Sequence, residues 1–293
     1  MNRLARDVAA EKVAMRLACP RCYGSIVPRD DVLHCEVCDV VGVLRGEIAS
    51  FQSDAGLESY FDQRIEQLNT TTANNWAFSY AEPVSLLGSY LKDAMILLDI
   101  GCGSRLPYEP RQDAFVIGVD LSAEALRANR RLDLRVHSSA AALPVRPASI
   151  HLIICFYSLH HMIGRTIQET RGNVIACLRE CARALNPGGT LFIVENNPRG
   201  LFRLFQRWGW APAKRILRRH LDMFFWTRQE LDQLLLEATG HPAARILKCE
   251  SARLALISPF FAIPQFKVFR FMHPLNCSVS VWRKRSSSLL AQP

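Results

Sequence analysis

LLDIGCGSR (97–105) and VIGVDLS (116–122) decide the fold of this 293-residue chain. Each stretch is an apolar run that ends in an acid, Asp99 in the first and Asp120 in the second, and the first acid is followed by a turn with two glycines. An apolar strand with a glycine-containing turn, followed about twenty residues later by a strand that ends in an acid, is typical of a nucleotide-type cofactor site. The sequence therefore predicts such a cofactor at the carboxyl edge of a parallel sheet.

The turn after the first acid favours S-adenosylmethionine (SAM) over a dinucleotide. Gly101 and Gly103 let the backbone approach a ligand closely, because no side chain intervenes. A dinucleotide site needs a third glycine for packing of the helix and the pyrophosphate, and Ser104 and Arg105 begin that part of the turn instead. The carboxylate of Asp120 is placed to accept hydrogen bonds from both hydroxyls of an adenosyl ribose.

Strand and helix patterns alternate from residue 94 onward. A helix pattern at 167–185 stops at a turn over 186–189, and TRQE (227–230) is a capping box before another helix, which Gly240 ends. The predicted strands are 95–100, 115–120, 134–139, 149–158, 190–195 and 277–284. This alternation predicts a doubly wound, Rossmann-like α/β domain with a mostly parallel sheet. We expect a seven-stranded sheet, of which these six strands are located, preceded by a small zinc ribbon.

The ribbon is predicted from two Cys-x-x-Cys pairs. Cys19 and Cys22 form the first pair, Cys35 and Cys38 form the second, and twelve residues separate the pairs. Two such pairs place four thiolates at the corners of a tetrahedron, as zinc requires, and leave no open position for catalysis. We therefore expect a structural zinc ion, whose binding supplies the folding energy that a module of this size lacks. The ribbon can also serve to bind RNA, protein or substrate.

The predicted organisation has four parts: an N-terminal helix (1–17), the ribbon (18–50), a helical linker or cap (51–93) and the cofactor domain (94–293) with inserts at 199–226 and 251–275. In the linker, a predicted helix at 58–68 either covers the cofactor pocket or is a plain connector.

The composition of the chain indicates which binding partners and which cellular location to expect. Hydrophobic residues make up 49% of the chain, and the formal net charge is +9, which favours nucleic acid, acidic lipid or a phosphorylated substrate unless the surface is merely basic. No secretory signal is visible, and no run reaches the ~18 apolar residues that span a bilayer. We expect a cytoplasmic protein, in which contact with a membrane surface is one alternative. The sequence does not predict an oligomeric state.

Two further segments, LPVRPASIHLIICFYSLHHM (143–162) and LRECARALNPGGTLFIVE (178–195), resemble the class I SAM-dependent methyltransferases. The order and spacing match over 95–240. The resemblance implies that SAM lies with its methionine end on the first turn, its ribose on the second acid, its adenine beside the third strand and an aromatic ring beneath it. The implied cofactor-binding residues are Asp99, Gly101, Cys102, Gly103, Asp120, Leu121, Ser139, Ala140 and Phe156.

The ribbon resembles the N-terminal module of ribosomal RNA guanine methyltransferases, and equally the small ribbon fused to many methyltransferases of unknown acceptor. Arg105 and Ser139 depart from the common pattern of the family. This leaves a non-catalytic binding protein with the same fold as one alternative.

His160 and His161 are the candidate catalytic residues. They follow the fourth predicted strand on the cofactor side of the sheet, where a histidine can act as a base near neutral pH. The alternative is that they cap the next helix or pack in the loop. Tyr157 and Glu195, at strand ends, are further candidates.

The insert RGLFRLFQRWGWAPAKRILRRH (199–220) contains no acid. Leu201, Phe202, Phe205 and Trp208 can share one helical face with arginines beside it, which suits a lid over the acceptor pocket, a membrane surface or an anionic ligand. The segment 254–274 can form a second apolar wall. Together these segments predict a small, apolar or lipid-like acceptor, with ribosomal or transfer RNA as the alternative.

Overall fold

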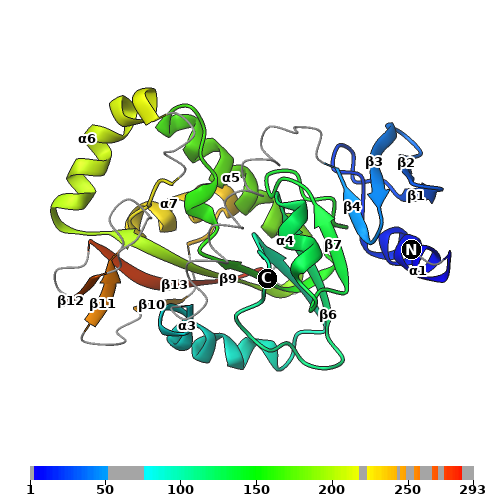
Figure 1. The fold of residues 1–293 in the computed structure, drawn as a ribbon, viewed down its shortest axis with the longest axis horizontal. Coiled ribbons are helices and arrows are strands. Elements are labelled where there is room, and N and C mark those ends of the chain that lie inside the picture. The colour runs from blue at the N-terminus through cyan, green and yellow to red at the C-terminus, as the bar shows by residue number, and fades with distance from the viewer. Residues whose placement is uncertain are drawn as a thin grey trace, which may run out of the picture.

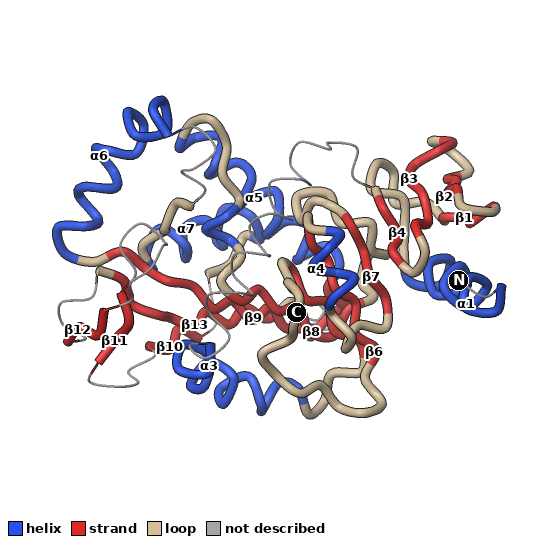
Figure 2. Tube along the Cα trace, in the orientation of Figure 1, coloured by secondary structure: helices blue, strands red, loops and turns tan. Residues whose placement is uncertain are grey.

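The molecule is built on one open sheet, which has eleven strands in the described part of the chain (Figures 1 and 2). The computed structural model describes residues 3–51, 76–217, 223–242, 245–248, 254–257, 266–269 and 274–285. The strands that follow residue 94 in this sheet are β5 (Ile96–Ile100), β6 (Phe115–Asp120), β7 (Leu134–His137), β8 (Ile150–Phe156), β9 (Leu185–Pro198), β10 (Arg245–Lys248) and β13 (Leu275–Arg283). Their order is β7-β6-β5-β8-β9-β13-β10, and only β13 among them is antiparallel to its neighbours. The predicted doubly wound, mostly parallel seven-stranded sheet is confirmed.

The sheet is buried on both faces, as a parallel sheet requires. Leu97 and Leu98 in β5 are both fully buried, but they belong to two separate hydrophobic clusters, one on each face of the sheet. The same alternation recurs in β8, where Ile153 and Ile154 face opposite clusters. The first cluster includes residues of α5 (Ile167–Ala184) and α7 (Arg228–Thr239), and the second includes residues of α3 (Trp76–Leu91) and α4 (Ala123–Ala128).

Three of the α-helices in the described part of the chain begin at a side-chain cap. The bounds of the helices are α1 (Arg3–Arg16), α3 (Trp76–Leu91), α4 (Ala123–Ala128), α5 (Ile167–Ala184), α6 (Gly200–Leu217) and α7 (Arg228–Thr239). Ser122 caps α4 by accepting a hydrogen bond from the Ala125 N–H. Thr227 and Glu230 form the predicted capping box of α7, which ends at Gly240 in the left-handed conformation.

β9 is longer than predicted. The segment 186–189, expected as a turn between helix and strand, already belongs to β9, because the backbone of Gly188 and Gly189 pairs with that of Lys284 just beyond β13. Gly188 still adopts the positive φ of 81° that the turn chemistry predicts.

The remaining four strands come from the N-terminal cysteine module, residues 18–50. They are β1 (Ile26–Arg29), β2 (Val32–Cys35), β3 (Asp39–Arg45) and β4 (Ile48–Ser50), an antiparallel meander. β4 then pairs in parallel with β7, so the module extends the sheet of the α/β domain. Figure 1 shows α1 and these strands at one end of the molecule and α6 at the other.

Two predicted features fall largely outside the described residues. The helix expected at 58–68 lies outside them entirely. Within 254–274, the described pieces are β11 (Leu254–Ile257) and β12 (Phe266–Phe269), which form an antiparallel hairpin. No helix in the described part of the chain has the length and hydropathy needed to cross a membrane.

Candidate functional site

The candidate cofactor site lies where the order of the sheet reverses. β5 has β6 on one side and β8 on the other, so the turns that follow these strands meet at one carboxyl edge. Gly101 and Gly103 adopt φ values of 67° and 56°, which a side chain would strain. A Cβ atom at Gly101 would lie 2.7 Å from the Cβ of Ser158, whereas a Cβ at Gly103 would meet nothing within 4 Å. The turn is therefore tight against β8 at its start and open at its middle.

Asp120 ties the two turns together. Its carboxylate accepts hydrogen bonds from the Gly103 N–H (2.9 Å to Oδ2) and from the Ser122 N–H (2.9 Å to Oδ1). Burial raises the pKa of Asp120, although these backbone donors oppose the shift. Each carboxylate oxygen retains a second lone pair, so the group can still accept hydrogen bonds from a ligand diol.

Asp99 is the second buried acid of the site. Its Oδ2 accepts a hydrogen bond from the Tyr108 hydroxyl at 2.7 Å. Burial raises the pKa of Asp99 to about 7, and the nearby charge of Asp120 adds to this shift. A cationic ligand close to this carboxyl would favour its ionised form.

Ser158 was not among the predicted site residues. It follows β8, is only 8% exposed, and its Oγ atom has no hydrogen-bond partner within the described structure. An orphaned buried hydroxyl beside the Gly101 turn is a feature that a polar ligand would satisfy. The open space at Gly103, the two acids and this hydroxyl together fit the ribose and amino-acid ends of SAM. The signal available in the sequence was the position of Ser158 at the end of a buried strand.

The residues expected near adenine lie beside the same edge. Leu121 follows Asp120, and its carbonyl lies 3.2 Å from Nε2 of His137 at the end of β7. Ser139 accepts a hydrogen bond from the Ala141 N–H and so shapes the turn that contains Ala140.

Cys102 and Phe156 contribute to the floor of the site. The Cys102 side chain is buried, and a Cβ atom at Gly118 would lie 2.8 Å from its Sγ, so the thiol belongs to the core. The Phe156 ring stacks on Tyr108, with 6.3 Å between the ring centroids. The structure thus gathers the predicted cofactor residues at the carboxyl ends of β5, β6 and β8 and on the turns that follow β5, β6 and β7.

His160 forms a buried pair with Glu195. Its Nδ1 lies 2.7 Å from Glu195 Oε2, and the other oxygen of Glu195 accepts a hydrogen bond from the Leu159 N–H at 2.8 Å. The two side chains are 6% and 5% exposed. This carboxylate orients the imidazole through Nδ1, so that Nε2 is the nitrogen left to exchange a proton. The His161 ring lies beside that of His160, at 4.3 Å between centroids.

A short aromatic segment, 223–227, covers this pair and joins it to α6. The Phe225 ring stacks on His160 at 5.0 Å, and the Phe224 N–H donates to the His160 carbonyl. Gln206 of α6 hydrogen-bonds both backbone groups of Phe225, at 2.8 and 3.0 Å. α6 is therefore held directly behind the ring that packs on His160.

The prediction that the apolar face of α6 packs against the protein is only partly confirmed. Phe202 is half-buried and its ring faces Phe225, whereas Leu201, Phe205 and Trp208 are exposed to solvent. The expected lid, with this apolar face turned onto an acceptor pocket, is therefore not what the structure shows.

Asn197, at the same edge of the sheet, and the predicted candidate Tyr157 already have partners within the fold. Asn197 is buried, donates a hydrogen bond from its side chain to the Trp226 carbonyl and accepts one from Ser278. The Tyr157 hydroxyl donates to Cys277 Sγ at 3.2 Å, and Tyr157 has a positive φ of 50°.

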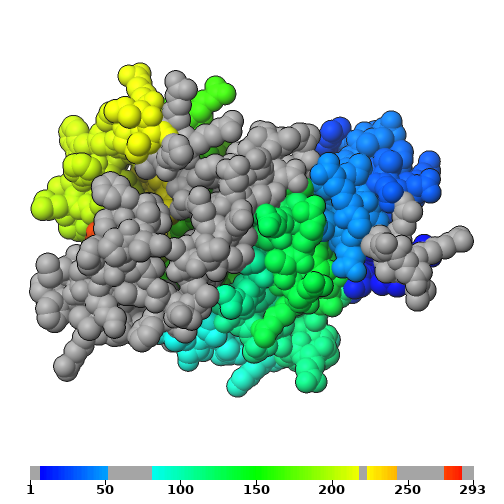
Figure 3. Space-filling view, in the orientation of Figure 1, coloured from blue at the N-terminus to red at the C-terminus, as the bar shows by residue number. Residues whose placement is uncertain are grey.

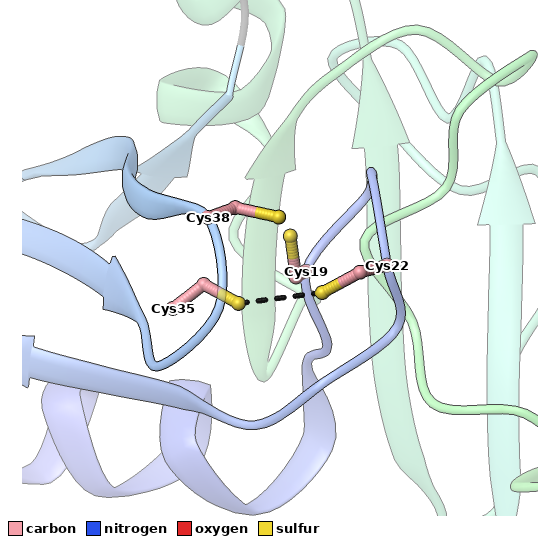
Figure 4. Close-up of side chains that lie close together, drawn as sticks. All are labelled: Cys19, Cys22, Cys35 and Cys38. Carbon is pink, nitrogen blue, oxygen red and sulfur yellow. Dashed lines mark hydrogen bonds between the residues drawn. The ribbon is translucent and has the colours of Figure 1, made fainter.

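The four predicted metal ligands come together in the cysteine module. Figure 4 shows their side chains pointing toward one another, and their Sγ atoms all lie within 4.8 Å of one another. Tetrahedral zinc would hold its sulfur ligands about 3.8 Å apart, so the cluster needs only small movements to close on the ion. The Val37 N–H donates to Cys35 Sγ, and this hydrogen bond lowers the pKa of Cys35 to about 7.

Comparisons with known proteins agree with this architecture. Residues 98–193 match a protein family described as a methyltransferase domain. Over 111 residues the chain is 32% identical to the ubiquinone biosynthesis O-methyltransferase of Xanthomonas campestris pv. campestris (strain B100), which is 34% of this chain and 43% of that protein. The protein of the same name from Xylella fastidiosa (strain 9a5c) is 31% identical, with 34% and 42% covered. The chain thus spans less than half the length of these curated relatives.

Solved structures extend the similarity of fold over most of the chain. The [4+2]-cyclase SpnF has a TM-score of 0.52 at 16% identity, covering 79% of this chain and 96% of that chain. Phosphoethanolamine N-methyltransferase 2 of Haemonchus contortus, solved with S-adenosylhomocysteine, has a TM-score of 0.51 at 15% identity, with 80% and 61% covered. At these identities the similarity shows the fold alone. The matched family and the sheet order together show a methyltransferase domain with the fold of the class I SAM-dependent methyltransferases, preceded by a four-cysteine module.

Proposed function

We propose that this protein transfers the methyl group of SAM to a hydroxyl of a small, apolar or lipid-like acceptor, with His160 as the general base. The observation that carries the proposal is the buried pair formed by His160, in the turn after β8, and Glu195, in the carboxyl-terminal part of β9, next to the cofactor edge. The apolar rings of Phe225 and its neighbours beside this pair suit an acceptor with little charge. The name of the curated relatives, an O-methyltransferase of ubiquinone biosynthesis, supports the same class of acceptor.

The proposed reaction is an in-line displacement at the methyl carbon. The acceptor oxygen forms a bond to that carbon while the carbon–sulfur bond breaks, and its electron pair stays on sulfur to give S-adenosylhomocysteine. His160 Nε2 takes the hydroxyl proton, and Glu195 stabilises the resulting imidazolium through Nδ1. The bound cofactor would rest on Asp99, Gly103 and Asp120.

We also propose that the cysteine module binds one structural zinc ion through Cys19, Cys22, Cys35 and Cys38. The support is the spacing of the four Sγ atoms and the all-thiolate donor set.

The test follows labelled methyl groups from SAM into host-cell extract, which is then separated into organic-soluble, RNA and protein fractions. We expect label in the organic-soluble fraction with the natural protein. His160→Asn retains an amide that can still donate to Glu195, and we expect it to lower transfer about 100-fold or more. Its affinity for S-adenosylhomocysteine should not change, whereas Asp120→Ala should lose that affinity. Methyl transfer that survives in His160→Asn would contradict the assignment of the base.

RNA is the second candidate acceptor, favoured by the net charge of +9 and by the module at the end of the sheet. Label in the RNA fraction would replace the small acceptor with RNA, and in that case the interaction should weaken steeply with salt. No transfer into any fraction, with intact cofactor binding, would favour a non-catalytic binding protein of the same fold.

A further inference from the structure

α6 carries a strip of large apolar side chains that face solvent. Leu201, Phe205, Trp208 and Ile216 are 83%, 77%, 81% and 80% exposed. Their spacing places them within one arc of the helix surface. Isolated exposed apolar residues are ordinary, but a continuous strip that includes Phe and Trp marks a contact surface.

The helix is held so that this strip stays outward. On its opposite side, Trp210 is buried and its indole N–H donates to the Met223 carbonyl at 3.3 Å. Gln206, one turn earlier, forms two hydrogen bonds with the backbone of Phe225. Rotating α6 to bury the strip would break these three hydrogen bonds and expose Trp210.

The charged side chains of α6 have one sign, and Arg215 is the one that lies next to the strip. Arg203, Arg207, Lys214 and Arg215 lie on α6, and the helix contains no acid. Arg207 pairs with Glu230 of α7 at 2.7 Å but remains 70% exposed. An apolar arc with Trp and Phe, on a helix whose charged side chains are all Arg and Lys, is the composition of helices that lie in the surface of a bilayer.

We propose that the outward face of α6 docks this protein on anionic lipid membranes. The apolar strip would enter the boundary between headgroups and acyl chains, while the basic side chains contact the lipid phosphates. A second copy of the chain suits this face less well, because paired α6 helices would bring like charges together. Figure 3 shows the atoms of α6 at the outer rim of the molecule, at the end away from the cysteine module.

Membrane docking does not depend on the proposed reaction, but it would affect which acceptors can reach the proposed base. α6 holds Phe225, and Phe225 packs on His160. A membrane beneath α6 would therefore lie close to the proposed base, which suits an acceptor that is dissolved in lipid.

The experiment is sedimentation of the full-length protein with vesicles of phosphatidylcholine mixed with phosphatidylglycerol, compared with vesicles of phosphatidylcholine alone. We expect binding to the anionic vesicles that weakens with added salt. The variant Phe205→Ser/Trp208→Ser should lower this binding about tenfold or more. Arg203→Glu/Arg215→Glu should lower binding to the anionic vesicles only. The matched control is Met15→Ser, which removes a 57% exposed apolar side chain from α1 at the other end of the molecule.

All variants change exposed positions, so their melting temperatures and their affinity for S-adenosylhomocysteine should match those of the natural protein. Failure of the natural protein to sediment with anionic vesicles would overturn the proposal. Light scattering provides a second check, because a dimer that dissociates in Phe205→Ser/Trp208→Ser would make this strip a contact between copies and would also overturn it. Neither measurement requires methyl transfer, so the docking and the reaction can fail separately.

Discussion

Asp99 links the cofactor site to pH. Its pKa of about 7 means that, without ligand, the carboxyl is half protonated near neutral pH. The sulfonium and ammonium groups of SAM would favour the ionised carboxylate, so binding should release a proton when the pH is below that value. We expect the affinity for SAM to fall as pH drops below about 7, by at most about tenfold per pH unit, and to level off above it. Calorimetric titration over this pH range measures the effect.

The same pKa has an opposite consequence for the ligand-free fold. Because the folded pKa lies above the value of about 3.9 for the unfolded chain, Asp99 lowers the free energy of unfolding as pH rises from about 4 to about 7. Asp99→Asn can keep the hydrogen bond from Tyr108 without a buried charge. It should therefore raise the melting temperature at neutral pH while flattening the pH profile of SAM binding. A variant with the original pH profile would show that another group titrates.

The N-terminal cap of α7 should contribute to the stability of the whole fold. The Thr227 Oγ1 accepts a hydrogen bond from the Glu230 N–H, and Glu230 accepts one from the Thr227 N–H. Thr227→Ala removes the first of these, so we expect the free energy of unfolding to fall by about 1 kcal/mol, measured by urea denaturation. Gln229→Ala, in the exposed first turn of the same helix, is the control and should leave stability almost unchanged. Equal losses in both variants would point to helix propensity instead of the cap.

β4 connects the cysteine module to the cofactor edge. Ser50 Oγ lies 2.9 Å from His137 Nδ1, and His137 Nε2 lies 3.2 Å from the Leu121 carbonyl, next to Asp120. Removing the metal should loosen β4 and with it this chain of contacts. We expect a chelator to weaken binding of S-adenosylhomocysteine by about fivefold or more, measured by calorimetry on the otherwise intact protein.

Ser50→Ala is the matched variant for this connection. It leaves the four cysteines in place, so it should retain zinc but reproduce part of the loss of affinity. Unchanged affinity in the chelated protein would show that the module and the cofactor edge are independent.

Features that depend on residues close along the chain could be predicted from the sequence, whereas features that depend on distant residues could not. The strands, the cap at Thr227 and the four-cysteine cluster depend on neighbours close along the chain, and the structure confirms them. The extension of β9 depends on Lys284, about a hundred residues away, and the pairing of β4 with β7 joins two segments that no local pattern connects. The partnership of His160 with Glu195 is of the same kind, because only the sheet order brings the ends of β8 and β9 together.

At the scale of the whole molecule, the cysteine module and the α/β domain share one core. Leu17 and Leu33 of the N-terminal part belong to the same buried cluster as Leu98 and Val136. The Tyr23 hydroxyl, one residue after Cys22, donates to Glu180 of α5 at 2.9 Å, and the Arg183 guanidinium lies 4.0 Å from the centre of the Tyr23 ring. Glu180 in turn accepts a hydrogen bond from the Leu143 N–H, so this contact ties the module to the turn after β7.

One cooperative unfolding unit should result from this shared core. In the presence of zinc we expect a single calorimetric transition, with equal calorimetric and van't Hoff enthalpies. A chelator should lower its midpoint, because the free energy of metal binding contributes to folding. Tyr23→Phe keeps the ring under Arg183 but removes a hydrogen bond to the buried Glu180, so it should lower the free energy of unfolding by about 1–2 kcal/mol and leave the zinc content unchanged. Two separate transitions in the zinc-loaded protein would show instead that the module folds as an independent unit, and the effect of Tyr23→Phe would then be confined to the contact between them.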